Sequence, residues 1–130
     1  MSKQSLTTYT LSIGLITLLC MSLFSCGSAE KSVKRGDAAL ALGEYAEAAG
    51  QYKKAYGQTS PKDKAARGRI AYKMGDAYRR YGNIARATGS FQNAVRYHYT
   101  DTLTYLMLGH MLRQQGNYKG AEEAYRKYLE

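Results

Sequence analysis

The side chains able to do chemistry are few and scattered. His98 and His110 fall in different predicted helices, with no cysteine or carboxylate at the spacing of a metal site. Glu122 and Glu123 are adjacent, so on a helix they project at different angles and do not form a catalytic pair. No glycine-rich phosphate loop follows a strand, and no catalytic triad can be argued. The sequence therefore predicts a protein that is not an enzyme and takes no metal or cofactor.

Cys26 is the exception, because an unpaired thiol in an exported chain needs an explanation. Residues 11–24 form an apolar run of about 14 residues after Lys3, shorter than the roughly 20 that cross a membrane. Such a run followed by a small residue is typical of a secretory signal. Cys20 lies inside the run and would be removed with it, which leaves Cys26 alone.

The segment Leu23-Phe24-Ser25-Cys26 resembles the bacterial lipobox, although Phe24 is bulkier than that family usually has there. The resemblance implies that residues 1–25 are a lipoprotein signal peptide and that Cys26 becomes the lipidated first residue. An ordinary signal peptide or an uncleaved anchor are the alternatives. We expect residues 26–29 to be a short flexible tether to the folded body, residues 30–130. Because no Asp follows Cys26, the expected location is the outer membrane, with the body in the periplasm.

The formal net charge is +9, or +8 once Lys3 has left with the signal. In a cytosolic protein this excess would suggest nucleic acid, but export removes that partner. Anionic lipid head groups or an acidic protein face remain, beside the simpler reading that a basic surface keeps the domain soluble.

A glycine pattern recurs three times along the chain. Each copy has a turn glycine, an alanine five residues later, and a second glycine seven residues upstream. The copies are spaced by 39 and then 34 residues, the longer spacing containing Pro61. The turn glycines are Gly43, Gly82 and Gly116, and the upstream ones are Gly36, Gly75 and Gly109.

This pattern resembles the tetratricopeptide repeat, a helix–turn–helix unit of 34 residues. The resemblance implies an all-α solenoid of three antiparallel helix pairs, with repeats at about 29–61, 68–100 and 102–130. We predict helices at 30–42 and 46–57, 62–81 and 85–98, and 102–115 and 119–130. Ser60 before Pro61 is the predicted cap of the third helix. Ser32 and Arg35 depart from the family pattern, as expected of a polar outer face on a first helix.

The repeated small residues predict close helix crossings. Gly75 and Gly109 are expected to face Ala87 and Ala121 of the partner helices, where larger side chains would overpack. Large aromatic residues would then fill the space between successive pairs. Seven of the thirteen tyrosines fall on repeat positions and are predicted to be mainly core.

The resemblance also implies a groove lined by the first helix of each pair. The groove is expected to be mixed apolar and basic and not a carboxylate clamp, since Tyr72 and Leu106 stand where the clamp has polar residues. The alternative is that several of these side chains are only solvated. The groove residues are Val33, Asp37, Arg69, Tyr72, Asp76, Arg79, Leu103, Leu106, His110 and Arg113.

We therefore expect a lipid-anchored adaptor that mediates protein–protein interactions at the bacterial cell envelope, within a secretion or outer-membrane complex. Its partner would be an envelope protein or peptide segment in the groove. The alternative is a structural lipoprotein, or the N-terminal part of a longer protein, that links membrane and cell wall without a groove ligand. The lipobox with early repeats is similar to gram-negative lipoproteins of the OmpA-like, type IX secretion-associated kind, whose later domains this chain does not contain.

Overall fold

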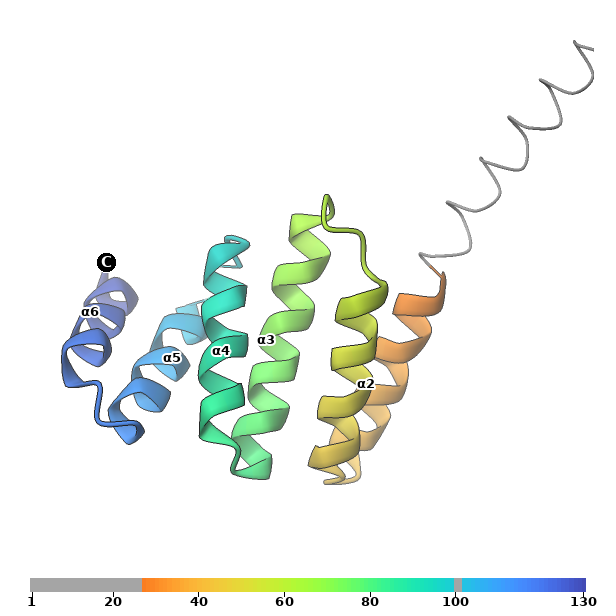
Figure 1. Ribbon diagram of the computed structural model, residues 1–130, viewed down its shortest axis with the longest axis horizontal. Helices are drawn as coiled ribbons and strands as arrows, with labels where there is room; N and C mark the ends of the chain where they lie inside the picture. The colour runs from red at the N-terminus through yellow and green to blue at the C-terminus, as the bar shows by residue number, and fades with distance from the viewer. Residues whose placement is uncertain (1–26, 100–101) are drawn as a thin grey trace, which may run out of the picture.

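The computed structural model describes residues 27–99 and 102–130, which form helices and turns without any strand (Figure 1). Residues 27–41 are helical. They are followed by α2 (Tyr45–Gln58), α3 (Lys64–Tyr81), α4 (Ile84–Arg96), α5 (Thr102–Gln114) and α6 (Tyr118–Leu129). None of these helices is long and apolar enough to cross a membrane. The predicted signal peptide and Cys26 lie outside the described residues.

Successive helices run antiparallel and stack side by side in chain order, so the molecule is an extended row of helix pairs (Figure 1). The predicted all-α solenoid of helical hairpins is confirmed. Most helix bounds lie within one or two residues of the predicted ones. The first helix differs more, because residues 27–29, predicted to be a flexible tether, are already helical and Ala29 is buried.

Each pair turns at a glycine in the left-handed conformation, as the repeat pattern predicts. Gly43, Gly82 and Gly116 have φ values of +77°, +87° and +78°, which residues with a Cβ rarely adopt. In the second and third pairs an asparagine follows the glycine and caps the next helix. Asn83 accepts a hydrogen bond from the Arg86 amide at 3.1 Å, and its counterpart Asn117 does the same for α6.

The longer connection before α3 corrects one prediction. Ser60 is not the cap: α3 begins at Lys64, and the Asp63 carboxylate accepts a hydrogen bond from the Ala66 amide at 3.0 Å. The Asp63 amide itself donates to the Ser60 carbonyl at 3.0 Å, so Pro61 and Lys62 form a turn outside the helix. Pro61 therefore belongs to the connection and not to the first turn of α3.

The predicted partner of the upstream glycines is also wrong. A Cβ on Gly75 would lie 2.9 Å from the Phe91 ring, so the nearest side chain is this aromatic residue and not, as predicted, Ala87. Gly36 and Gly109 meet the rings of Tyr52 and Tyr125 in the same way. The aromatic residues therefore pack within their own helix pair, across the missing side chain of each glycine.

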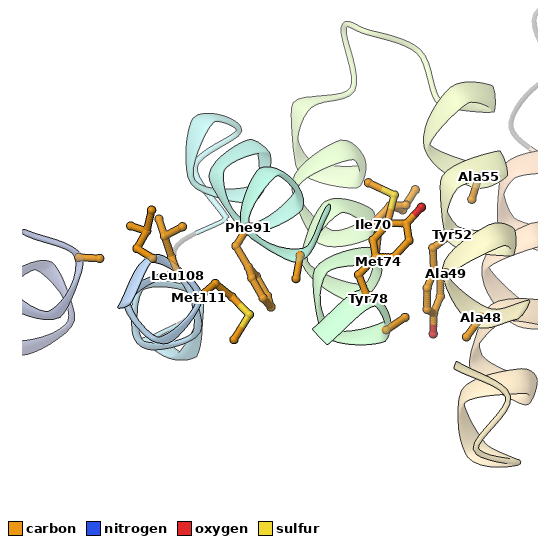
Figure 2. Close-up of a cluster of buried hydrophobic side chains, with 14 of the residues drawn as sticks. Ala48, Ala49, Tyr52, Ala55, Ile70, Met74, Tyr78, Phe91, Leu108 and Met111 are labelled. Carbon is orange, nitrogen blue, oxygen red and sulfur yellow. The ribbon is translucent and has the colours of Figure 1, made fainter. Parts of the chain in front are cut away.

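The buried apolar side chains form one cluster that continues from pair to pair along the row (Figure 2). Tyr52 and Phe91 are fully buried, and each such side chain contributes about 1.5–3 kcal/mol when removed from water. Ala48 and Ala87 lie beside them with no exposed surface. The tyrosines on repeat positions are not uniformly core, since Tyr118 keeps 72% of its surface exposed at the start of α6.

Ser32 does not lie on a polar outer face, as the sequence suggested. It is buried, and its hydroxyl donates to the Gln58 side chain of α2 at 2.9 Å. Of Ser32 and Arg35, only Arg35 is exposed. The small polar side chain therefore joins the first two helices by a hydrogen bond.

Candidate functional site

A hollow of about 340 Å³ lies between helix 27–41 and α3, bounded by the connection after α2. Its lining mixes apolar groups with polar groups from the connection and from both helices. The hollow joins the first helices of two successive pairs, which is the face where the repeat pattern predicts a groove. It is lined by Ala29, Glu30, Val33, Gln58, Thr59, Ser60, Asp63, Ala66, Arg69 and Ile70.

Val33 and Arg69 are the two predicted groove residues that meet in this hollow. Val33 is half-buried and packs against the core, whereas Arg69 is exposed and makes no ion pair with any described residue. The hollow thus offers an apolar wall and one available guanidinium. Two carboxylates also line the hollow: Glu30 pairs with Lys34 at 3.1 Å, and Asp63 accepts a hydrogen bond from the Ala66 amide.

Asp37, a second predicted groove residue, is held by the fold. The Tyr52 hydroxyl and the Lys73 ammonium each donate a hydrogen bond to its carboxylate at 2.6 Å. Burial favours the neutral acid, but these bonds outweigh it and hold the Asp37 pKa below its usual 3.8. Because Lys73 belongs to α3, this carboxylate ties the first helix pair to the second.

Asp76 is likewise engaged within its own helix. Its two carboxylate oxygens accept hydrogen bonds from Arg79 at 2.6 Å and from Arg80 at 2.8 Å. The predicted groove residues Asp76 and Arg79 are therefore brought together, but as an internal pair. Their charges are largely compensated before any partner arrives.

Tyr72 is half-buried and forms part of an aromatic cluster. Its ring centroid lies 5.7 Å from that of Phe91 and 5.3 Å from that of Tyr99. Contacts of this kind contribute about 0.5–1.5 kcal/mol beyond burial. Tyr72 therefore supports the packing of α3 on α4, and its replacement would disturb the fold as well as a groove.

Arg67 makes contacts between helix pairs beside this cluster. Its guanidinium lies 4.1 Å from the Tyr56 ring centroid and 5.6 Å from that of Tyr97, and it donates to the Thr59 carbonyl at 3.1 Å. Burial and a hydrogen bond with Tyr97 raise the Tyr56 pKa, although Arg67 opposes this. Arg67 thereby ties the connection after α2 to the end of α4.

The predicted groove residues of the third pair are dispersed along α5. Leu103 is 45% exposed, Leu106 is half-buried and Arg113 is exposed. The His110 ring lies 5.7 Å from that of Tyr125 on α6, so it also takes part in packing within its pair. Of the four predicted groove residues in this pair, Leu103, Leu106 and Arg113 therefore keep surface for a partner.

Most residues that line the hollow were not predicted from the sequence, in particular those of the connection and Ala66 and Ile70 of α3. The signal that could have revealed them is the 39-residue spacing of the first two copies. The extra residues wrap over the end of α3 and form one wall. Among residues 27–99 and 103–130 no group of acidic, histidine or cysteine side chains could hold a metal ion.

A protein-family model described as tetratricopeptide repeat matches residues 32–71 and 72–130. The chain belongs to the tetratricopeptide repeat family. Such repeats mediate protein–protein interactions. The structural comparison agrees: the tetratricopeptide repeat domain of Arabidopsis FLU superposes with a TM-score of 0.72 at 19% identity, covering 81% of this chain and 94% of that one.

The tetratricopeptide repeat domain of Sgt2 from Aspergillus fumigatus gives a TM-score of 0.64 at 26% identity. The alignment covers 78% of this chain and 64% of that chain. The comparison with curated proteins gave no match. The feature shared with these structures is thus the helical repeat.

Proposed function

We propose that this protein is an adaptor that binds a segment of another protein across the face formed by helix 27–41, α3 and α5. The observation that carries the proposal is the hollow between the first two of these helices, in a repeat family that mediates protein interactions. An apolar side chain of the partner would enter the hollow and remove apolar surface from water. Arg69 would bind a partner carboxylate at the rim.

The charges along this face favour that assignment of roles. Asp37 and Asp76 are already bonded to cations, so they add little repulsion toward an acidic partner. Arg69 and Arg113 remain exposed and make no ion pair among the described residues. A partner with an acidic residue near an apolar one matches this combination.

The hollow is tested by filling it. Ala66→Phe places a ring in the hollow, whereas Ala65→Phe, one residue earlier on α3, adds the same ring to an exposed position outside the lining. Proteins captured from solubilised membranes by the wild type should be lost with Ala66→Phe and retained with Ala65→Phe. Equal melting temperatures of the two variants would exclude unfolding as the cause.

The opposite outcome is equally clear. If both variants capture the same proteins as the wild type, the hollow is not the binding site. Arg69→Gln and Arg113→Gln then test the remaining surface, because neither side chain is needed for a described ion pair. Tyr72 is a poor probe because its ring packs on Phe91.

We further propose that Cys26 carries the lipid and holds the adaptor at the periplasmic side of the outer membrane, as part of an outer-membrane or secretion complex. The lipobox-like segment and the lone thiol of Cys26 support this membrane location. Two or three acyl chains hold a protein firmly, whereas one binds reversibly. Cys26→Ser should block lipid attachment and the normal maturation of the chain. A variant that matures normally and stays with the membrane would refute the anchor.

A further inference from the structure

We propose that the edge of the molecule nearest residue 27 is a docking surface for an anionic lipid bilayer. This inference rests on the proposed anchor at Cys26. The surface, called the basic edge below, consists of exposed cations near the ends of four helical segments and in the connection between α2 and α3: Lys31, Lys54, Lys62, Lys64 and Arg96. None of them makes an ion pair with any residue of 27–99 or 103–130.

The antiparallel fold gathers these cations from distant parts of the sequence. Lys31 lies near the start of helix 27–41, Lys54 one turn before the end of α2, and Lys64 at the start of α3. Lys62 belongs to the connection, and Arg96 ends α4. Figure 1 shows these helix ends along one edge of the row, the edge at which the described chain begins.

Few acids oppose them there. Glu30 is paired with Lys34, and Asp63 caps α3 through the Ala66 amide. The basic edge therefore keeps a clear positive excess, which complements a negatively charged surface.

The other edge of the first two helix pairs has fewer exposed cations without an ion pair among the described residues. Arg79 and Arg80 are bonded to Asp76, and Arg86 lies 5.6 Å from the Tyr78 ring centroid. Glu44, in the turn of the first pair, is exposed and makes no ion pair among the described residues. In the first two helix pairs, the exposed cations without an ion pair among the described residues are therefore more numerous at the basic edge than at the other edge, where Arg86 is one. This difference favours orientation against a charged surface over general solubility.

A bilayer fits this edge better than an acidic protein because of where the chain enters. Residue 27 directly follows Cys26, so acyl chains on Cys26 would bring the basic edge to the head groups. Each Lys or Arg near an anionic surface is favoured by about 1 kcal/mol, or roughly fivefold. The cations would therefore fix how the tethered body stands on the membrane.

The test measures lysine acetylation in the full chain, purified in detergent and reconstituted into protein-free vesicles. Vesicles of phosphatidylcholine alone are compared with vesicles containing phosphatidylglycerol. At low salt, anionic vesicles should slow acetylation of Lys31, Lys54, Lys62 and Lys64 by roughly fivefold, and high salt should restore it. Lys119, at the start of α6 on the other edge, should react equally in both.

Two variants sharpen the result. Lys54→Gln, Lys62→Gln and Lys64→Gln together should abolish the protection of Lys31, whereas Lys119→Gln should leave it unchanged. Flotation with the neutral vesicles reports the anchor separately, so loss of anchoring and loss of the lipid surface are distinguishable. Equal acetylation in neutral and anionic vesicles would overturn the proposal. Protection found only in native membranes would overturn it in favour of an acidic protein.

Discussion

Gly75→Ala should destabilise the protein because the added methyl group has no space. Its Cβ would lie 2.9 Å from both Cδ1 and Cε1 of Phe91, closer than real Cβ contacts come. The Phe91 ring is fully buried and is held against Tyr72, so it cannot move aside freely. Overpacking of this kind costs about 1–3 kcal/mol. The better helix propensity of alanine returns roughly 0.5–1 kcal/mol, so the expected net loss is between about 0 and 2.5 kcal/mol.

Gly89→Ala on α4 is the matched control. A Cβ there meets nothing within 4 Å, and the residue is helical, so the substitution should stabilise by about 0.5–1 kcal/mol. Because the propensity gain is common to both variants, their difference isolates the overpacking cost of about 1–3 kcal/mol. Urea unfolding followed by circular dichroism measures it. If Gly75→Ala stabilises as much as Gly89→Ala, the tight crossing on Phe91 is wrong.

Two further predictions concern the contacts between successive helix pairs. Asp37→Asn should cost about 0.5–1 kcal/mol at pH 6, because a partly exposed ion pair with Lys73 is lost. The pKa of Asp37 is lowered in the folded protein, so this stability is present above about pH 3.8 and is lost as the pH falls through the folded pKa. The difference in stability between wild type and variant should therefore disappear in acid. A difference that persists to pH 2 would contradict this. Arg67→Met should lower the unfolding free energy by about 1–2 kcal/mol through loss of the Tyr56 contact and a carbonyl hydrogen bond. Arg67→Lys should restore only part of that loss in the same melts, and full recovery would show that charge alone matters.

The fold was predictable where a local rule decides the structure. Turn glycines at a fixed spacing require left-handed backbone, and Gly82 and Gly116 adopt it. Periodicity could not say which side chain fills the space above Gly75, because both Ala87 and Phe91 lie on the inner face of α4 and both are fully buried. The volume of the side chain decides which residue packs there, because the missing Cβ leaves a space that a ring fills and a methyl group does not.

The candidate site was less predictable because lateral neighbours determine it. Asp37 was correctly placed on the first helix, yet its hydrogen bond to Lys73 of α3 depends on how two pairs stack. Likewise the hollow depends on the path of the connection, and Thr59 and Asp63 enter its lining only because α3 begins at Lys64. Sequence spacing alone carries neither piece of information.

The two Gly-Asn turns affect how such a protein can gain or lose repeats. Gly82 ends one helix and Asn83 begins the next, and the same two residue types recur 34 positions later. A segment from Asn83 to Gly116 therefore starts with its own cap and finishes with its own left-handed residue. Duplicating or deleting that segment leaves a native junction at both breaks. The row can change length by whole units within one gene without any new turn having to arise.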